Sequence, residues 1–460
     1  MGKGKSVAIM KDLAGSSKKM RSLLVISMML MLWSADTVVA QDPAAATGTL
    51  PKIDAGDTAW VLISAAMVML MTPGLAFFYG GLVRRKNILS ILMQCFMTLC
   101  LVTVQWVVFG YSVAFGPDKH GLIGGLEWAA LSLIDGKPNP EYAATIPHSA
   151  FMMFQMMFAV ITPSLIIGAF AERIRFSAFC VFTILWTTLV YDPVAHWVWG
   201  VGGFMRDWGT LDFAGGTVVH VNAGMAALAA SLVLGRRQGY PHKTSSPHSL
   251  PLAFLGASIL WFGWFGFNAG SALGANGLAA TALVATQVAG AVAGLTWAGL
   301  DWFVHKKPTT LGIITGAVGG LVAITPAAGY VNAVGAMAIG LGAGILPWLA
   351  VTFLKNKLGY DDSLDAFGVH GVGGIWGALA TGLFATKMVN PAADGLLYGN
   401  PGQFLIQCKA VALVMAFSFV SSFVLLKAIN VVIKLRVNEH DERVGLDLTQ
   451  HKEAGYTVIE

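Results

Sequence analysis

Long stretches of apolar residues, separated by short polar segments, dominate the chain from Thr58 onward. We count about eleven of them, each near or above the ~20 residues that a helix needs to cross a bilayer. They cover residues 58–80, 88–115, 147–171, 176–201, 215–235, 251–270, 277–303, 309–328, 331–354, 366–386 and 402–434. Several contain glycine or proline, which membrane helices tolerate when neighbouring helices satisfy the backbone. The pattern predicts an all-α integral membrane protein with about eleven transmembrane helices.

The beginning of the chain has a different pattern. Three basic residues between positions 18 and 21 precede the apolar run 23–33, and small residues lead up to Ala40. The run is too short to span a bilayer, so the pattern predicts a signal peptide over residues 1–40. Residues 41–57 would then be an extracytoplasmic segment ahead of a membrane domain at 58–434.

Positive charges are sorted between alternate loops. One set of loops holds Arg84-Arg85-Lys86, Arg173 with Arg175, Arg236-Arg237 with Lys243, His305-Lys306-Lys307, Lys355 with Lys357, and Lys434 with Arg436. The other set holds only Lys119, Lys137, Arg206 and Lys387. Basic loops remain in the cytoplasm, which predicts a multi-pass protein with its amino terminus outside. The polar segment 435–460 would be a cytoplasmic tail.

Two histidines lie inside apolar helices that are rich in small residues. His220 ends Asp212-Phe-Ala-Gly-Gly-Thr-Val-Val-His220 in the fifth span, and His370 ends Asp365-Ala-Phe-Gly-Val-His370 in the tenth. A lone histidine there is more often a packing residue, but ionisable groups at membrane depth commonly mark a transport path. Two spans that lie five apart and run in opposite directions suggest a five-plus-five inverted repeat with the substrate path at its interface. The eleventh span would be an extra C-terminal helix.

Composition narrows the class further. The chain is 56% hydrophobic and 12% charged, and that charged share is about half of the roughly 25% usual in soluble domains. Its four cysteines lie in apolar runs, so neither a disulfide framework nor a metal site is expected. The net charge of +5 is explained by the loops and implies no nucleic-acid partner. No nucleophile–base set appears, so we expect neither an enzyme nor a cofactor.

Aromatic residues accompany the histidines in three segments. These are Phe154-Gln-Met-Met-Phe158 in the third span, His196-Trp-Val-Trp199 in the fourth, and Trp261-Phe-Gly-Trp264-Phe-Gly-Phe267-Asn-Ala-Gly-Ser271 in the sixth. Aromatic side chains near membrane interfaces are mostly belt residues, and this reading stays open for Trp199. If the rings instead face a pore, a cation at its mouth could rest on them, which is worth up to ~2 kcal/mol or more once the cation is desolvated.

These segments resemble the ammonium transporter (Amt/Mep/Rh) family, in its bacterial Amt branch. The resemblance covers about residues 54–456 and rests on Phe77-Phe-Tyr-Gly-Gly-Leu82, Ala171-Glu-Arg-Ile-Arg-Phe176, Asp212-Phe-Ala-Gly-Gly-Thr-Val-Val-His220, Gly263-Trp-Phe-Gly-Phe-Asn-Ala-Gly-Ser271 and Phe367-Gly-Val-His-Gly371. It implies a homotrimer in the inner (cell) membrane, with a pore through each eleven-helix subunit.

The resemblance also implies roles for single residues. Phe158, Trp199 and Ser271 match the outer site that receives the ammonium ion, and Phe158 and Phe267 match a stacked phenylalanine gate. Trp264, His220 and His370 match the pore lining. Asp212 matches an acidic residue that shapes the outer region. The function implied is recruitment and deprotonation of ammonium, followed by conduction of ammonia with or without the proton.

Alternatives to this function remain open. The chain could be an ammonium sensor with little flux, or a channel for another small neutral solute such as carbon dioxide or water. The segment Gly445-Leu-Asp-Leu-Thr-Gln-His451 resembles the family's cytoplasmic tail, which can meet trimeric nitrogen-signalling proteins of the PII type. Lys452 departs from the pattern that we expect after it. Asp192, next to Pro193 in the fourth span, is a candidate buried acid without an assigned role.

Overall fold

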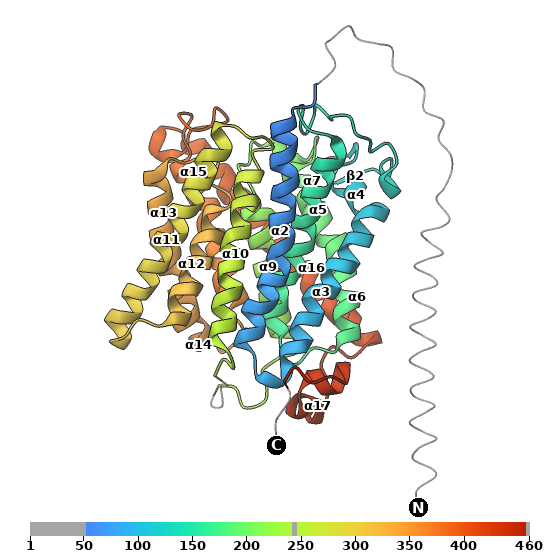
Figure 1. Ribbon diagram of the computed structural model, residues 1–460, viewed down its shortest axis with the longest axis vertical. Helices are drawn as coiled ribbons and strands as arrows, with labels where there is room; N and C mark the ends of the chain where they lie inside the picture. The colour runs from blue at the N-terminus through green and yellow to red at the C-terminus, as the bar shows by residue number, and fades with distance from the viewer. Residues whose placement is uncertain (1–51, 242–245, 457–460) are drawn as a thin grey trace, which may run out of the picture. The chain divides into compact units, whose positions relative to one another are not determined.

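Near-continuous apolar sequence produces long helices that run side by side (Figure 1). The computed structural model describes residues 52–241 and 246–456. In this part of the chain ten helical segments are long and apolar enough to cross a membrane. They are Ala55–Leu82, Arg85–Phe115, His148–Phe170, Phe176–Asp207, Gly216–Leu234, Leu250–Gly270, Gly277–His305, Ala333–Leu358, Phe367–Phe384 and Pro401–Val432. The prediction of an all-helical membrane protein is confirmed.

Several of these segments combine α-helices with π-helical turns. The α-helices are α2 (Ala55–Leu82), α3 (Ile88–Gln105), α4 (Tyr111–Phe115), α5 (His148–Phe170), α6 (Phe176–Trp186), α7 (Asp192–Trp199), α8 (Phe204–Asp207), α9 (Asn222–Leu234), α10 (Leu250–Gly270), α11 (Gly277–His305), α12 (Thr310–Ile324), α13 (Ala333–Leu349), α14 (Lys355–Leu358), α15 (Val372–Phe384), α16 (Pro401–Val432) and α17 (Glu439–Val444). The π-helical turns are η2 (Trp106–Gly110), η4 (Thr187–Tyr191), η5 (Gly216–Val221), η6 (Ala350–Leu354), η7 (Phe367–Gly371) and η9 (Asp447–His451). Such turns often occur at functional sites.

Short elements complete the fold. The 3₁₀ turns are η1 (Arg85–Asn87), η3 (Ala129–Leu131) and η8 (Leu396–Tyr398). Strands β1 (Asp118–Lys119) and β2 (Ile123–Gly124) pair antiparallel, with Lys119 opposite Ile123. Several helices begin at a side chain that accepts a backbone N–H of their first turn, as polar N-cap residues do. These N-cap residues are Asp54, Ser249, Asn276, Thr309, Asn332, Asn400 and Asn438.

The eighth predicted span, residues 309–328, is shorter in the structure. Helix α12 has 15 residues and ends at Ile324, two residues before Pro326. Proline lacks a backbone N–H and therefore cannot continue the helical hydrogen-bond ladder. The Pro326 carbonyl instead accepts the N–H of Phe213, ahead of η5. The count is thus ten membrane-length segments and one shorter apolar helix among the described residues.

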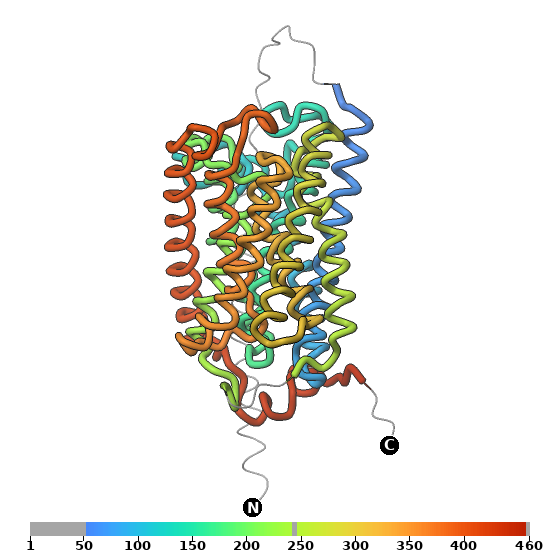
Figure 2. The backbone as a smooth tube through the Cα atoms, turned by 90° about the vertical axis from the view of Figure 1, so that its left-hand side faces the viewer, coloured from blue at the N-terminus to red at the C-terminus, as the bar shows by residue number. Residues whose placement is uncertain are grey.

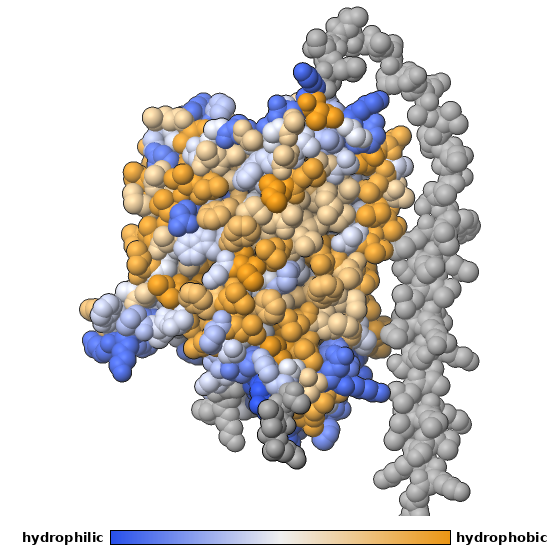
Figure 3. Space-filling view, in the orientation of Figure 1, coloured by the Kyte–Doolittle hydropathy of each residue, from blue (hydrophilic) through white to orange (hydrophobic). Residues whose placement is uncertain are grey.

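Burial separates inner from outer helices. Nearly all of α5 and α12 is buried, whereas α16 buries one face and lies along one side of the bundle (red, left in Figure 2). On the face shown in Figure 3, a broad apolar band covers the middle of the bundle, and polar residues gather toward its two ends. Residues 435–456 lie at one end, which we call the tail face. We call the opposite end, which carries β1, β2 and the end of α7, the loop face.

Some predictions lie beyond these observations. The signal peptide at residues 1–40 is outside the described residues, and so is most of the segment 41–57. The domain boundaries at 58–434 and 435–460, the membrane orientation and the five-plus-five repeat stay predictions.

Candidate functional site

Asp212 organises the start of the fifth span. Its carboxylate accepts four backbone N–H groups, from Gly215 and Gly216 at one oxygen and from Thr217 and Val218 at the other, at 2.7–3.1 Å. These groups open η5, and the first N–H groups of a helix have no partner within the helix. A negative charge is also favourable at a helix N-terminus. The carboxylate thus fixes the turn that carries His220.

The tenth span begins in the same way, but not at the aspartate that its sequence suggested. The same sequence spacing separates Asp212 from His220 and Asp362 from His370. An Asp362 oxygen accepts the Phe367 N–H at 2.7 Å in η7. Asp365 has a left-handed backbone (φ 60°) and pairs with Lys355 instead. The corresponding aspartate is therefore Asp362, which the matching spacing could have revealed.

The two histidines meet at the centre of the bundle. Their ring centroids lie 5.4 Å apart and the rings are inclined by 14°. Close backbone approach allows this, since a side-chain carbon on Gly224 of α9 would lie 2.2 Å from the Gly371 Cα atom. Within the described part of the chain, neither ring nitrogen of His220 has a hydrogen-bond partner. The two rings are thus nearly parallel, and no direct hydrogen bond joins them among the described residues.

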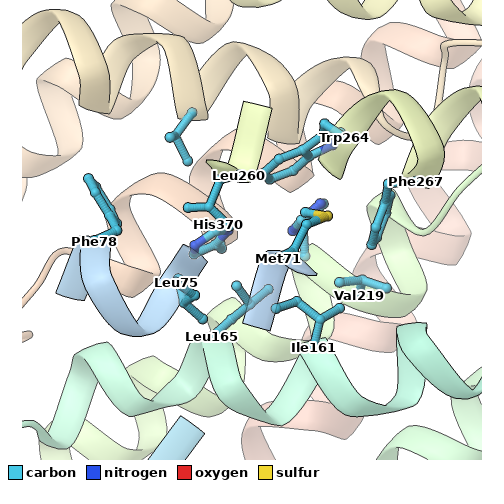
Figure 4. A pocket seen from close by; sticks show the side chains of 12 residues that line it. Met71, Leu75, Phe78, Ile161, Leu165, Val219, Leu260, Trp264, Phe267 and His370 are labelled. Atoms are coloured by element: carbon cyan, nitrogen blue, oxygen red, sulfur yellow. The ribbon is translucent and has the colours of Figure 1, made fainter. Parts of the chain in front are cut away.

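A narrow cavity is lined by both His220 and His370, and Figure 4 shows it with His370 labelled. Its volume is about 10 Å³, near the ~10–15 Å³ that one water-sized molecule requires. Apart from the histidines, Trp264 and Phe267 are the lining residues expected from sequence; the others are Met71, Leu75, Phe78, Ile161, Leu165, Val219, Leu260 and Val318. The Trp264 ring lies parallel to that of His220 at 5.6 Å, and its N–H donates to the Thr325 hydroxyl at 2.8 Å. We call this space the histidine cavity.

A larger cavity opens toward the loop face, and we call it the vestibule. It has a volume of about 310 Å³, and Phe158, Trp199 and Ser271 are among its lining residues. The Trp199 ring stands perpendicular to that of Phe158 at 5.9 Å, and its N–H donates to the Asp212 carbonyl at 2.9 Å. The Ser271 hydroxyl donates to the Phe267 carbonyl, which leaves its lone pairs free to accept hydrogen bonds.

Two phenylalanines separate the vestibule from the histidine cavity. Phe158 of α5 lines the vestibule and Phe267 of α10 lines the histidine cavity. Their ring centroids are only 4.2 Å apart, with an interplanar angle of 33°. Both rings are almost completely buried. Passage between the cavities requires these rings to move.

A third cavity, of about 480 Å³, lies on the tail-face side of His370. It is more polar and is lined by Arg237, Lys355 and Asp365 among others. Phe78 of α2 lines both this cavity and the histidine cavity, and so stands between them. Sequence reasoning missed Phe78, although it lies within the Phe77–Leu82 motif.

Glu172 links the tail face together. Its carboxylate receives hydrogen bonds from Arg84 at 2.8 Å and 2.9 Å and from the Asn87 amide at 2.8 Å, and it pairs with Arg237 at 3.2 Å. Burial opposes its ionisation, but Arg84 and Arg237 hold the pKa of Glu172 below its ordinary value. The tail joins this cluster, because the Leu446 N–H donates to the Asn87 side chain at 2.8 Å.

Asp192 is buried but lines none of these three cavities. One of its oxygens accepts a hydrogen bond from the Gln105 amide at 2.6 Å, and this bond ties α7 to α3.

Across residues 52–241 and 246–456, no three His, Cys, Asp or Glu side chains gather as a metal ion would require. The structure therefore brings the predicted site residues together around neighbouring cavities and places Asp192 apart.

The structure is thus an all-helical, membrane-spanning bundle with a pair of buried histidines next to two stacked phenylalanines. The chain belongs to the Ammonium Transporter Family, whose model matches residues 59–456. It is similar to the ammonium transporter of Bacillus subtilis, with 51% identity over 402 residues, which cover 87% of this chain and 98% of that one. Ammonium transporter Amt1 of Archaeoglobus fulgidus is 48% identical over 403 residues, 87% of this chain and 99% of its own.

Solved structures agree with this assignment. Mep2 of Saccharomyces cerevisiae superposes with a TM-score of 0.80 at 36% identity, over 85% of this chain and 89% of that chain. A structure described as a Sensor Amt Protein gives a TM-score of 0.79 at 31% identity, over 86% of this chain and 98% of that one. The chain is thus a multi-pass ammonium transporter and not an enzyme.

Proposed function

We propose that ammonium ion is recruited in the vestibule, loses its proton beside the stacked phenylalanines and proceeds as ammonia past His220 and His370. The observation that carries this proposal is the sequence of three cavities, in which a space of about 10 Å³ lies between two larger ones. An intact cation would have to shed its water there, and uncompensated burial of a charge costs tens of kcal/mol in the idealised limit.

Each group in the path has a separate role. The faces of Phe158 and Trp199 attract a cation through their quadrupoles, and the Ser271 oxygen accepts one of its hydrogen bonds. As neutral imidazoles, His220 and His370 offer ammonia both a donor and an acceptor without a fixed charge. Asp212 acts through the turn that it holds. Phe78 would be a second barrier, toward the tail face.

The vestibule would face the outside of the cell and the tail face the cytoplasm, as the loop charges predict. We further propose a homotrimer in the cell membrane, with a pore in each subunit and a tail available to a PII-type partner. These proposals rest on the loop charges and on the family resemblance.

Substitution of Trp199 tests the recruitment site. Trp199→Leu keeps apolar bulk but removes the strongest ring quadrupole, so uptake into proteoliposomes should fall more at low ammonium than at high ammonium. Val198→Leu, a neighbouring change that leaves the ring in place, serves as the control. If uptake by Trp199→Leu depends on ammonium concentration as it does in the parent, Trp199 is an interfacial aromatic residue without a role in recruitment.

The likeness to the Sensor Amt Protein keeps a sensing role as a second candidate. Purified protein in liposomes separates the two roles, because a sensor with little flux would bind methylammonium without accumulating it. Measurable uptake with a simultaneous current would support transport and would also report whether the proton follows.

A further inference from the structure

One positively charged residue lies in the wall of the vestibule. Arg206 belongs to the short helix α8 and lines the same cavity as Trp199 and Phe158. Its guanidinium donates to the Trp199 carbonyl at 2.8 Å, and its central carbon lies 6.0 Å from the Tyr142 ring centroid. A cation at that distance over an aromatic face is attracted to it. The vestibule therefore already holds a tethered cation.

This charge is not neutralised by a direct ion pair. Among the described residues, Arg206 makes no salt bridge, although its side chain is exposed to the vestibule. Asp212 also lines this cavity, but its carboxylate accepts four backbone N–H groups and is saturated by them. Glu141 is the other carboxylate in the lining. Asp207, the next residue along α8, is not part of it.

We propose that Arg206 sets the affinity of the vestibule for ammonium, as a fixed positive charge that limits how strongly cations accumulate next to Trp199. The proposal rests on the proposed recruitment of ammonium in the vestibule. Glu141 acts in the opposite direction as the lining carboxylate without saturating hydrogen bonds. Arg206 thus determines affinity through the field of its guanidinium, which donates a hydrogen bond to the Trp199 carbonyl of the recruitment site.

The physical argument is electrostatic. Charges that line a cleft with low-dielectric walls raise or lower the local concentration of a charged substrate. Arg206 also covers one face of Tyr142, which an incoming cation could otherwise use. Both effects weaken ammonium binding, and neither changes the histidine cavity, which lies beyond the stacked phenylalanines. The expected consequence is a change in half-saturating concentration at a constant maximal rate.

The experiment compares one substitution that removes the charge of Arg206 with one that keeps it. Arg206→Gln retains a donor for the Trp199 carbonyl but removes the charge, whereas Arg206→Lys retains the charge. We expect the half-saturating ammonium concentration in proteoliposomes to fall roughly two- to fivefold in the Gln variant. It should stay near the parent value in the Lys variant, with the maximal rate unchanged in both.

Ionic strength separates the field from a structural effect. The difference between parent and Arg206→Gln should shrink as salt rises from about 10 mM to about 500 mM, because screening shortens the range of exposed charges. Lys137→Gln removes an equal charge from an exposed loop residue that does not line the vestibule, so it should leave the half-saturating concentration unchanged. Glu141→Gln should raise that concentration, and the double change with Arg206→Gln should largely restore it.

The outcomes that overturn the proposal are distinct from failure of the recruitment site itself. An Arg206→Gln variant with parental half-saturation, in a background where Trp199→Leu still weakens recruitment, would refute the role of Arg206 alone. A higher half-saturating concentration in both Arg206 variants would show that the hydrogen bond to Trp199 matters and the charge does not. If Trp199→Leu also has no effect, the proposed recruitment of ammonium in the vestibule is refuted, and so is the role of Arg206 that rests on it.

Discussion

The two turns that carry the pore histidines share a backbone design and differ in their polar surroundings. A left-handed residue precedes each turn, Gly215 with φ 111° ahead of η5 and Asp365 with φ 60° ahead of η7. Each is held by an aspartate at the same spacing from its histidine. Asp212 places both oxygens on four N–H groups, whereas one oxygen of Asp362 has no partner among the described residues.

This difference shows how one local design serves two environments. Near the vestibule, all hydrogen bonds of the Asp212 carboxylate go to the backbone. Gly215 adopts the left-handed conformation there without steric cost. Near the tail face, a titratable side chain occupies the corresponding left-handed position and pairs with Lys355 at 2.6 Å. We infer that the first turn is a rigid support and that the second is coupled to its charged surroundings.

Separate replacement of Asp212 and Asp362 should give the largest difference in folding and transport between the two turns. Asp212→Ala leaves four buried N–H groups without acceptors, at roughly 1–3 kcal/mol each when unsatisfied. We expect loss of folded, transporting protein, whereas Asp212→Asn should still assemble. Asp362→Ala loses fewer bonds and should remain folded with a lower thermal stability. Size-exclusion profiles, thermal unfolding and liposome uptake measure these outcomes, and a stable, fully active Asp212→Ala would contradict the role of support.

Charge at the centre of the pore tests what the histidines do for selectivity. His220→Asp places an acceptor-only, potentially anionic group at that position, which lowers the barrier for an intact cation. We expect a potassium current where the parent passes none, with ammonium still carried. His220→Ala, which adds no charge, is the matched control and should not admit potassium.

The measurement is the current across proteoliposome membranes after separate potassium and ammonium jumps, with folding checked for each variant. Continued exclusion of potassium by a folded His220→Asp protein would move selectivity to the stacked Phe158 and Phe267 rings. The corresponding His370→Asp change extends the comparison to the second turn.

Truncation after Arg436 should disturb the tail-face end of the transport path and leave the vestibule unchanged. The tail contributes hydrogen bonds to that face, such as the 2.8 Å bond from the Ser90 N–H to Asp447. It contains no apolar run long enough to enter the membrane, so the truncated protein should still insert. We expect a reduced uptake rate, within about tenfold of the parent, and an unchanged half-saturating concentration. A parental rate would argue against coupling between tail and pore, and Asp447→Asn is a milder companion change.

The smallest expected effect is a dependence of stability on pH. Burial raises the pKa of Asp362 to about 6, Lys355 opposes this rise and Asp365 adds to it. An unfolded aspartate titrates near ~3.9, so this group contributes stability that is complete below about pH 4 and is lost as pH rises through about 6. Asp362→Asn should remove this loss, and unfolding temperatures at pH 5 and pH 7 should then differ less than in the parent.

Glu172 provides the control of opposite sign. Its pKa is held below the ordinary ~4.3 of glutamate. The stability that it contributes is therefore present above about pH 4.3 and is lost as pH falls through its folded pKa. Glu172→Gln should destabilise the protein most at neutral pH, where Asp362→Asn should stabilise it. Equal pH profiles for the two variants would contradict this assignment.

The sequence by itself determined the membrane class, the approximate spans and the two histidines. A long continuous apolar run favours a transmembrane helix, because every backbone polar group must be satisfied within the bilayer and a helix does so within one segment. The length of the eighth span was not predicted correctly, because the helix α12 ends at Ile324, before Pro326. The motifs around Asp212 and Phe367 also sufficed to recognise the ammonium transporter family.

Only the tertiary structure decided which side chains meet. Phe78 lies far from the histidines in sequence and becomes a wall of their cavity because α2 packs beside α10. The near-parallel arrangement of the His220 and His370 rings depends on close contact of two backbones at Gly224. Arg206 looked like a loop charge and lies in the vestibule because a hydrogen bond holds it to Trp199. Periodicity and spacing describe one segment at a time, whereas cavities arise where several segments pack together.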